Sequence, residues 1–203
     1  MARRAGSSRS RDMAQKGVPP SPYICRTIPH FDILDEGQIL RLEGQVDWIL
    51  QDVGIAFRDD STALELWRRE GATIEDDIVR APADWIRALC AKAPSEFIQL
   101  ARNRERSVVI GGNNQVFAPI YGAPFVRDLE GGRRYGDMKA FQDLVRLSYL
   151  HPNLHHGGFV TCEPCDVPVS KRHLDMLFAH MTLSDKPHLG AITEMSRAQD
   201  SVD

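Results

Sequence analysis

The sequence lacks most of the features that mark membrane, secreted and nucleic-acid-binding proteins. Its 203 residues contain only 4 cysteines, too scattered for a disulfide framework, so we expect a reduced protein of the cytoplasm. No apolar run approaches the roughly 20 residues that a membrane-spanning helix needs. An excess of one charge is also missing, because 25 Lys and Arg oppose 28 Asp and Glu. The net charge of −3 therefore gives no sign of a general binder of nucleic acid or anionic membranes.

What the chain does contain is typical of a soluble globular protein with one sizeable core. Hydrophobic residues make up 42% and charged residues 26% of the sequence. Residues 1–22 are the exception, since they are basic, rich in Ser and Pro, and without the apolar stretch of a secretory signal. We expect a disordered basic arm there, with an organelle transit peptide as the alternative.

Residues 23–96 predict a helical region. One apolar stripe runs from Asp35 to Val53 and stops at Gly54; its members are Ile39, Leu42, Val46, Ile49, Leu50 and Val53. Residues 72–80 alternate weakly between apolar and polar side chains, which predicts a short hairpin inside this region.

The rest of the chain changes character twice. Residues 97–135 are rich in Val, Ile, Phe, Gly and Asn, which predicts short strands joined by turns. Residues 136–203 predict helices alternating with strands, and the strands are expected at 156–161 and 186–192. A strand, a helix and a second strand in so short a stretch form a βαβ unit, so the two strands should be parallel and the fold class α/β. Such a unit cannot bury both faces of its sheet, so the chain looks truncated or assembles with another chain.

The segment HHGGFVTCEPCDVP, residues 155–168, concentrates histidine, cysteine and acid. A zinc site needs four ligands, but the chain has no second Cys-x-x-Cys and no spaced histidine pair, so we expect no metal. A redox pair would place Cys162 at a helix N-terminus, whereas the next helix is expected to begin near Ser170. The pattern favours a loop after a parallel strand, where α/β proteins bind ligands; a plain loop with half-buried cysteines stays open as the alternative.

Three further segments carry a family resemblance: DLEGGRRYGDMKAFQDLVRL from Asp128, DVPVSKRH from Asp166, and DKPHLGAITEMSRAQDS from Asp185. With the sequence around them, from about residue 30 to the last residue, they resemble the trimethylamine methyltransferase family, including members that act on quaternary amines such as glycine betaine. None of the segments is a catalytic motif by itself, so the resemblance names no catalytic residue.

The resemblance implies a TIM-type (β/α) barrel on a longer chain. Residues 136–203 would then be the first βα units of an incomplete barrel, preceded by the N-terminal helices and the small strand-rich region. It also implies methyl transfer from a methylated amine to the Co(I) centre of a corrinoid (cobalamin) that a separate partner protein supplies. On this view the chain binds no cofactor directly, and it mainly orients the C–N bond and excludes water.

Candidate substrate-binding residues follow from this chemistry, because a methylated ammonium binds to aromatic faces and to a carboxylate. They are Phe117, Tyr121, Phe159, Glu163 and Glu194, together with Asn113 in the turn over 111–114. Phe159 and Glu163 belong to the end and the following loop of the first expected barrel strand, and Glu194 follows the second. The structural alternative places the aromatic rings in the core and leaves the acids as solvated loop or helix-terminal charges.

Two other functions remain alternatives to a methyltransferase. The chain could be a non-catalytic, truncated remnant that at most binds a partner, or a small metal-binding module built on CEPC at 162–165. As 203 residues alone, we expect the protein to be aggregation-prone or homo-oligomeric, because one face and the edges of its partial sheet would be uncovered.

Overall fold

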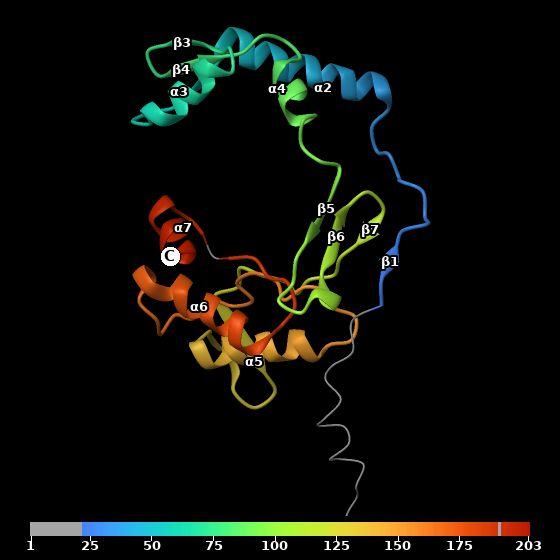
Figure 1. Ribbon diagram of the computed structural model, residues 1–203, viewed down its shortest axis with the longest axis vertical. Coiled ribbons are helices and arrows are strands. Elements are labelled where there is room, and N and C mark those ends of the chain that lie inside the picture. The colour runs from blue at the N-terminus through green and yellow to red at the C-terminus, as the bar shows by residue number, and fades with distance from the viewer. Residues whose placement is uncertain (1–21, 191) are drawn as a thin grey trace, which may run out of the picture. The chain divides into compact units, whose positions relative to one another are not determined.

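A computed structural model describes residues 22–190 and 192–203 and divides the chain into two compact units (Figure 1). One unit is Ile28–Ser95, and the other combines the N-terminal residues up to Thr27 with Glu96–Asp203. The basic arm expected over 1–22 lies outside the described residues except for its last position. Within those residues, no helix is long and apolar enough to cross a membrane.

Helix α2 opens the smaller unit and confirms the helix predicted from Asp35. It spans Glu36–Trp48 and continues as a π-helix, η1, over Ile49–Val53 before Gly54 ends it with a φ of 81°. Asp35 and Gln38 form a capping box, in which each side chain accepts a hydrogen bond from the other's backbone N–H. The apolar stripe of this helix is largely exposed, and α2 buries none of its residues.

The rest of the smaller unit packs around aromatic rings. The hairpin predicted over 72–80 is confirmed: strands β3 and β4 pair antiparallel, and β2 pairs with the other edge of β4. The rings of Phe57, Trp67 and Trp85 form a row with centroids 5.6 Å apart in each pair. The remaining elements of the unit are β2 (Ile55–Ala56), α3 (Ser61–Arg69), β3 (Thr73–Glu75), β4 (Ile78–Arg80) and α4 (Trp85–Cys90).

Short antiparallel strand pairs begin the larger unit, as the composition of 97–135 predicted. They are β1 (Ile24–Cys25) with β7 (Asn114–Gln115), β5 (Glu96–Gln99) with β6 (Val108–Gly111), and β8 (Phe125–Asp128) with β9 (Gly132–Tyr135). A short 3-10 helix, η2 (Arg104–Arg106), connects β5 to β6.

Three helices complete the larger unit: α5 (Met138–Leu150), α6 (Val169–Leu183) and α7 (Met195–Val202). The side chain of Asp137 caps α5 by accepting the N–H of Ala140 at 2.7 Å. The core of the unit lies where α5 and α6 pack on the chain around 160–162; its fully buried members include Phe141, Val145 and Cys162. Figure 1 shows α5 and α6 side by side.

Between these elements, three extended segments run in the same direction. Residues 155–163 lie between 117–123 and 186–189, and the residue numbers rise together along each pair of segments. The backbone hydrogen bonds that join them include Gly122 N to Val160 O at 2.8 Å, Glu163 N to Ala123 O at 2.9 Å, Gly157 N to Pro187 O at 2.8 Å and Leu189 N to Gly158 O at 3.0 Å.

The prediction of regular strands at 156–161 and 186–192 is wrong for the described residues, since neither segment forms a continuous ladder. Gly158 has a φ of 83°, which interrupts the extended backbone, and Pro187 has no N–H to donate. The sheets of the described residues are small, and none of them closes into a barrel. The partial TIM-type barrel and the boundaries near residues 96 and 135 therefore stay predictions.

Candidate functional site

The candidate site lies where the parallel segments end. In α/β proteins the carboxyl ends of neighbouring parallel strands form the edge that binds ligands. Here that edge is built by the chain around Tyr121–Ala123 and by 161–168, which the hydrogen bond between Glu163 N and Ala123 O joins. We call this edge the rim.

Two of the aromatic candidates meet at the rim. The rings of Tyr121 and Phe159 lie with centroids 5.9 Å apart at 79° to each other, the edge-to-face geometry that aromatic pairs favour. Phe159 is half-buried against the core of α5 and α6, whereas Tyr121 is 64% exposed. The pair therefore has one anchored ring and one ring available to a ligand.

Glu163, in the loop that follows Phe159, is held by an arginine that the sequence did not single out. Arg172, in the first turns of α6, donates to the Glu163 carboxylate at 3.0 Å and to the carbonyl oxygen of Val167 at 2.9 and 3.2 Å. The guanidinium thus closes the loop between Glu163 and α6 and leaves the carboxylate about one third exposed. A carboxylate fixed in this way is positioned to face a cation, although the guanidinium of Arg172 already offsets part of its negative charge.

The loop 162–168 is tied to the start of α5 as well. The side chain of Asp166 accepts the N–H of Met138 at 2.9 Å, and the N–H of Cys165 donates to Gly136 O at 2.9 Å. Gly136 is required here, because a Cβ at this position would lie 2.6 Å from Glu163 O and 3.1 Å from the Cys162 sulfur. The geometry of the loop is therefore fixed by contacts at both of its ends.

The other three candidates do not join Tyr121 and Phe159. Phe117 lies at the opposite end of its segment, where its ring packs on His155 with centroids 5.9 Å apart. Asn113 sits in the turn between β6 and β7, and its carbonyl oxygen accepts the N–H of Arg26 at 2.7 Å. Glu194 precedes α7 and pairs with Arg197 at 2.8 Å, so its charge already serves a local contact.

The two cysteines of CEPC are in different environments. Cys162 is buried in the core, and burial, with Asp137 as a further cause, raises the pKa of its thiol to about 11. Cys165 is exposed on the loop. In the described ranges no three His, Cys, Asp or Glu side chains are grouped so that they could hold a metal ion.

Two buried histidines, His156 and His180, gather with the half-buried His188 at the end of the parallel segments opposite the rim. The rings of His180 and His188 stack with centroids 4.9 Å apart and 4° between their planes. Burial lowers the pKa of His156 to about 4, with a contribution from His188 and His180, and burial also lowers the pKa of His180 to about 4. The neutral ring of His156 donates to Gln99 Oε1 at 3.2 Å, and the neutral ring of His180 donates to Phe159 O at 3.0 Å. Nothing in the sequence pattern indicated that these residues meet.

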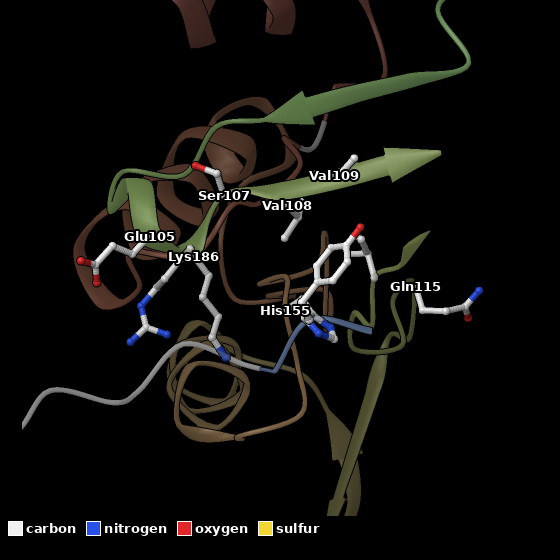
Figure 2. Close-up of a pocket in the computed structure, with 10 residues that line it drawn as sticks. Glu105, Ser107, Val108, Val109, Gln115, His155 and Lys186 are labelled. Atoms are coloured by element: carbon white, nitrogen blue, oxygen red, sulfur yellow. The ribbon is translucent and has the colours of Figure 1, made fainter. Parts of the chain in front are cut away.

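A cavity of about 160 Å³ lies near the same end and is lined by His155 and Lys186, among others (Figure 2). The ammonium of Lys186 donates to the carbonyl oxygens of Ser148 and His151, at the end of α5, and of Leu154, in the loop that follows, at 2.9, 3.2 and 2.7 Å. Burial lowers the pKa of this lysine to about 8. His155 accepts the N–H of Phe117 at 3.1 Å and bonds Pro22 O at 2.7 Å. These polar groups are therefore occupied in holding the chain together.

Comparisons with known proteins agree with the resemblance seen in the sequence. A sequence model of the family described as Trimethylamine methyltransferase (MTTB) matches residues 2–203. The glycine betaine methyltransferase of Desulfitobacterium hafniense (strain Y51) is 38% identical over 176 residues, which are 87% of this chain and 36% of that protein. The chain thus spans about a third of the length of the curated relative that it matches. Because the family match covers nearly every residue, the chain belongs to the trimethylamine methyltransferase family.

Proposed function

We propose that this chain contributes to an enzyme that removes a methyl group from a methylated amine, with glycine betaine as the first candidate substrate. The observation that carries the proposal is the family match over residues 2–203, together with the similarity to a protein named glycine betaine methyltransferase. The rim supports it, because an exposed aromatic ring and a fixed carboxylate are the groups that a quaternary ammonium prefers.

The roles we propose for the rim are binding and orientation. Tyr121 and Phe159 offer ring faces to the methylated nitrogen, and Glu163, on the loop that follows Phe159, supplies a negative charge. Phe159 is anchored in the core and Glu163 is anchored by Arg172, so both hold their direction when a ligand arrives. Such pre-organisation lowers the cost of aligning one C–N bond with an acceptor.

The acceptor that we propose is Co(I) of a corrinoid carried by a separate protein. It supplies a strong nucleophile, and the methyl carbon of a quaternary ammonium is an electrophile. The C–N bond breaks with its electron pair on nitrogen, so the amine leaves neutral and needs no proton from the protein. The chain is not required to bind the corrinoid itself, and no catalytic acid or base is assigned among its residues.

The test is a methyl-transfer assay with the polypeptide encoded by the whole reading frame that contains this chain. Reduced cobalamin serves as the acceptor, and glycine betaine, trimethylamine and unmethylated glycine are compared as donors. We expect cobalamin to be methylated with at least one of the methylated amines and not with glycine. A folded protein that methylates cobalamin with neither amine would exclude the proposed reaction.

A further inference from the structure

The β8–β9 hairpin lies next to the rim, and the binding of an amine proposed above does not explain the side chains on one of its faces. It lies in the chain between the extended segment 117–123 and α5. At its base the N–H of Gly136 donates to Pro124 O at 2.9 Å, and Gly136 O in turn accepts the N–H of Cys165. The hairpin is thus fixed to the same loop that carries Glu163.

The register of the hairpin separates its side chains into two faces. Residues directly opposite in an antiparallel pair point to the same side, and neighbours along a strand point to opposite sides. One face carries Val126, which packs against the core, and the ion pair between Asp128 and Arg134. The other face, which we call the outer face, carries Phe125 opposite Tyr135 and Arg127 opposite Arg133.

The outer face has two cations and no acid. The rings of Phe125 and Tyr135 lie 4.6 Å apart, and the guanidinium of Arg133 sits 3.8 Å above the Phe125 ring. Neither Arg127 nor Arg133 makes an ion pair with any residue that the structure describes, and both are exposed. Like charges directly opposite in a ladder destabilise it by up to about 1 kcal/mol, so the pair of Arg127 and Arg133 is unfavourable. Within the hairpin, the contact of Arg133 with the Phe125 ring is a favourable cation–π contact beside this pair.

The remaining arginine of the hairpin shows that an ion pair was available locally. Arg134 pairs with Asp128 on the inner face, and Asp128 also accepts the N–H of Gly131. The outer arginines have no such neighbour, although the chain as a whole carries more acids than bases. The cationic outer face is therefore a local feature and does not follow from the overall charge.

We propose that the outer face of the β8–β9 hairpin docks an acidic segment of a partner protein. Guanidinium groups bind carboxylates in bidentate fashion, and Tyr, Phe and Arg are the residues enriched at the centres of protein interfaces. Both arginines are exposed, so a small anion bound between them would stay partly hydrated. A segment that carries both carboxylates and apolar side chains can contact the two guanidinium groups and the two rings together. Leu129, fully exposed at the tip, extends the apolar part of the surface.

The position of the hairpin suggests which partner this is. A protein docked on the outer face stands beside the rim, because the base of the hairpin and the Glu163 loop are hydrogen-bonded to each other. The protein that accepts the methyl group has to approach that rim, and its identification as the partner rests on the proposed function. Docking of an acidic segment does not depend on that function.

The first test measures binding of a short synthetic peptide rich in glutamate and leucine to the chain by isothermal titration at low salt. A matched peptide with glutamine in place of glutamate is the comparison. We expect binding of the acidic peptide only, and binding about tenfold weaker for the double variant Arg127→Glu/Arg133→Glu. The variant Arg68→Glu/Arg69→Glu on α3 makes the same charge change elsewhere and should bind like the parent chain. Circular dichroism verifies that both variants fold.

Several results would overturn the proposal. They are failure of the acidic peptide to bind the parent chain, equal binding by the Arg127→Glu/Arg133→Glu variant, and displacement of the peptide by inorganic phosphate at similar concentration. The last result would identify a site for small anions instead of a docking surface.

A second test addresses the partner in the complete enzyme. With a corrinoid protein as acceptor, Arg127→Glu/Arg133→Glu should raise the KM for that protein about tenfold and leave transfer to free reduced cobalamin unchanged. An unchanged KM would overturn the identification of the acceptor as the docked partner. If the parent enzyme transfers to neither acceptor, the proposed function fails, and the peptide result still decides the docking surface.

Discussion

The rim depends on one residue for the direction of its carboxylate. Arg172 makes three hydrogen bonds, two to Val167 O and one to Glu163, and its side chain is mostly buried. A single guanidinium therefore connects the loop after Phe159 to the helix that follows. Its removal would leave a half-buried carbonyl and a carboxylate without their donor.

We predict that Arg172→Met lowers the free energy of unfolding by about 1–3 kcal/mol. Urea denaturation measures this change, and hydrogen exchange should show faster exchange over 162–168 in particular. Arg172→Lys keeps the charge but not the fork of donors, so it should be intermediate. Arg146→Met breaks an exposed pair with Asp143 and serves as the control, with an expected loss of less than about 1 kcal/mol. Equal stability of Arg172→Met and the parent chain would contradict the role of Arg172.

The buried histidines make the larger unit sensitive to acid. The pKa of His156 and His180 lies near 4 in the folded chain, against an ordinary value of 6.5. Between these values the unfolded chain binds more protons than the folded chain does, so stability falls as the pH falls from about 6.5 towards 4. Below about pH 4 both states are protonated, and this dependence ends.

The measurement is urea unfolding of the larger unit between about pH 7 and about pH 4.5. We expect a loss of stability of a few kcal/mol over this range, and a shallower dependence in His180→Gln, which cannot take up the proton. His30→Gln, which changes an exposed histidine of the smaller unit, is the control variant. A pH profile identical in His180→Gln and in the parent would show that His180 is not its source.

At the scale of elements, the parallel segments are held by close backbone contacts. Gly158 has a φ of 83°, and a Cβ there would lie 2.5 Å from Cγ of Pro119 on the neighbouring segment. The approach of 117–123 to 155–163 therefore depends on the absence of a side chain at this position. Gly122 has a similar φ of 87° but no heavy atom within 4 Å of the place of its Cβ.

We predict that Gly158→Ala destabilises the larger unit by about 1–3 kcal/mol more than Gly122→Ala does. Both variants introduce backbone strain, and only the first adds a steric clash, so their difference in urea unfolding isolates the close approach. Equal effects of the two variants would mean that the segments can separate there without cost.

Elements with local signals could be predicted from the sequence. Helix α2 has an apolar stripe between Asp35 and Gly54, and α5 has the cap at Asp137, so neighbours in the chain define both helices. The backbone conformation of the segments at 156–161 and 186–192 could not be predicted as well from the sequence. Their pairing is interrupted by the φ of Gly158 and by Pro187, which affect a ladder only when the partner segment is known.

The candidate site could be predicted in part for the same reason. Tyr121 and Phe159 were identified by residue type and meet at the rim, whereas Phe117 and Asn113 lie elsewhere. Lys186 was missed because its partners are far along the chain: its ammonium reaches Ser148 O across 38 positions. Arg172 was missed because its partners, Val167 and Glu163, lie in an irregular loop five and nine positions before it. Such contacts have no periodic pattern that a sequence could display.

At the scale of the whole molecule, much apolar surface is uncovered in both units. The exposed side chains include Leu42 and Val46 on α2, Phe178 and Met181 on α6, and Ile98 on β5; Phe178 is 68% exposed. Large exposed apolar side chains favour association between chains when they gather on one face. The chain also spans 36% of its relative.

We therefore predict that the 203-residue chain self-associates, which sedimentation velocity over a range of concentrations measures. The apparent mass should rise with concentration, and Phe178→Lys/Met181→Lys should reduce the rise because it places charge on the exposed face of α6. A monodisperse monomer at all concentrations would show that these apolar side chains do not drive association.

The central claim is that a methyl group leaves an amine and is captured by cobalt. The most direct measurement supplies glycine betaine with deuterated methyl groups and reduced cobalamin to the polypeptide encoded by the whole reading frame. Mass spectrometry then quantifies deuterated methylcobalamin and dimethylglycine. The account predicts that both products appear in equal amounts, because each C–N bond broken forms one C–Co bond. Absence of both products with a folded protein, for glycine betaine and trimethylamine alike, would contradict it.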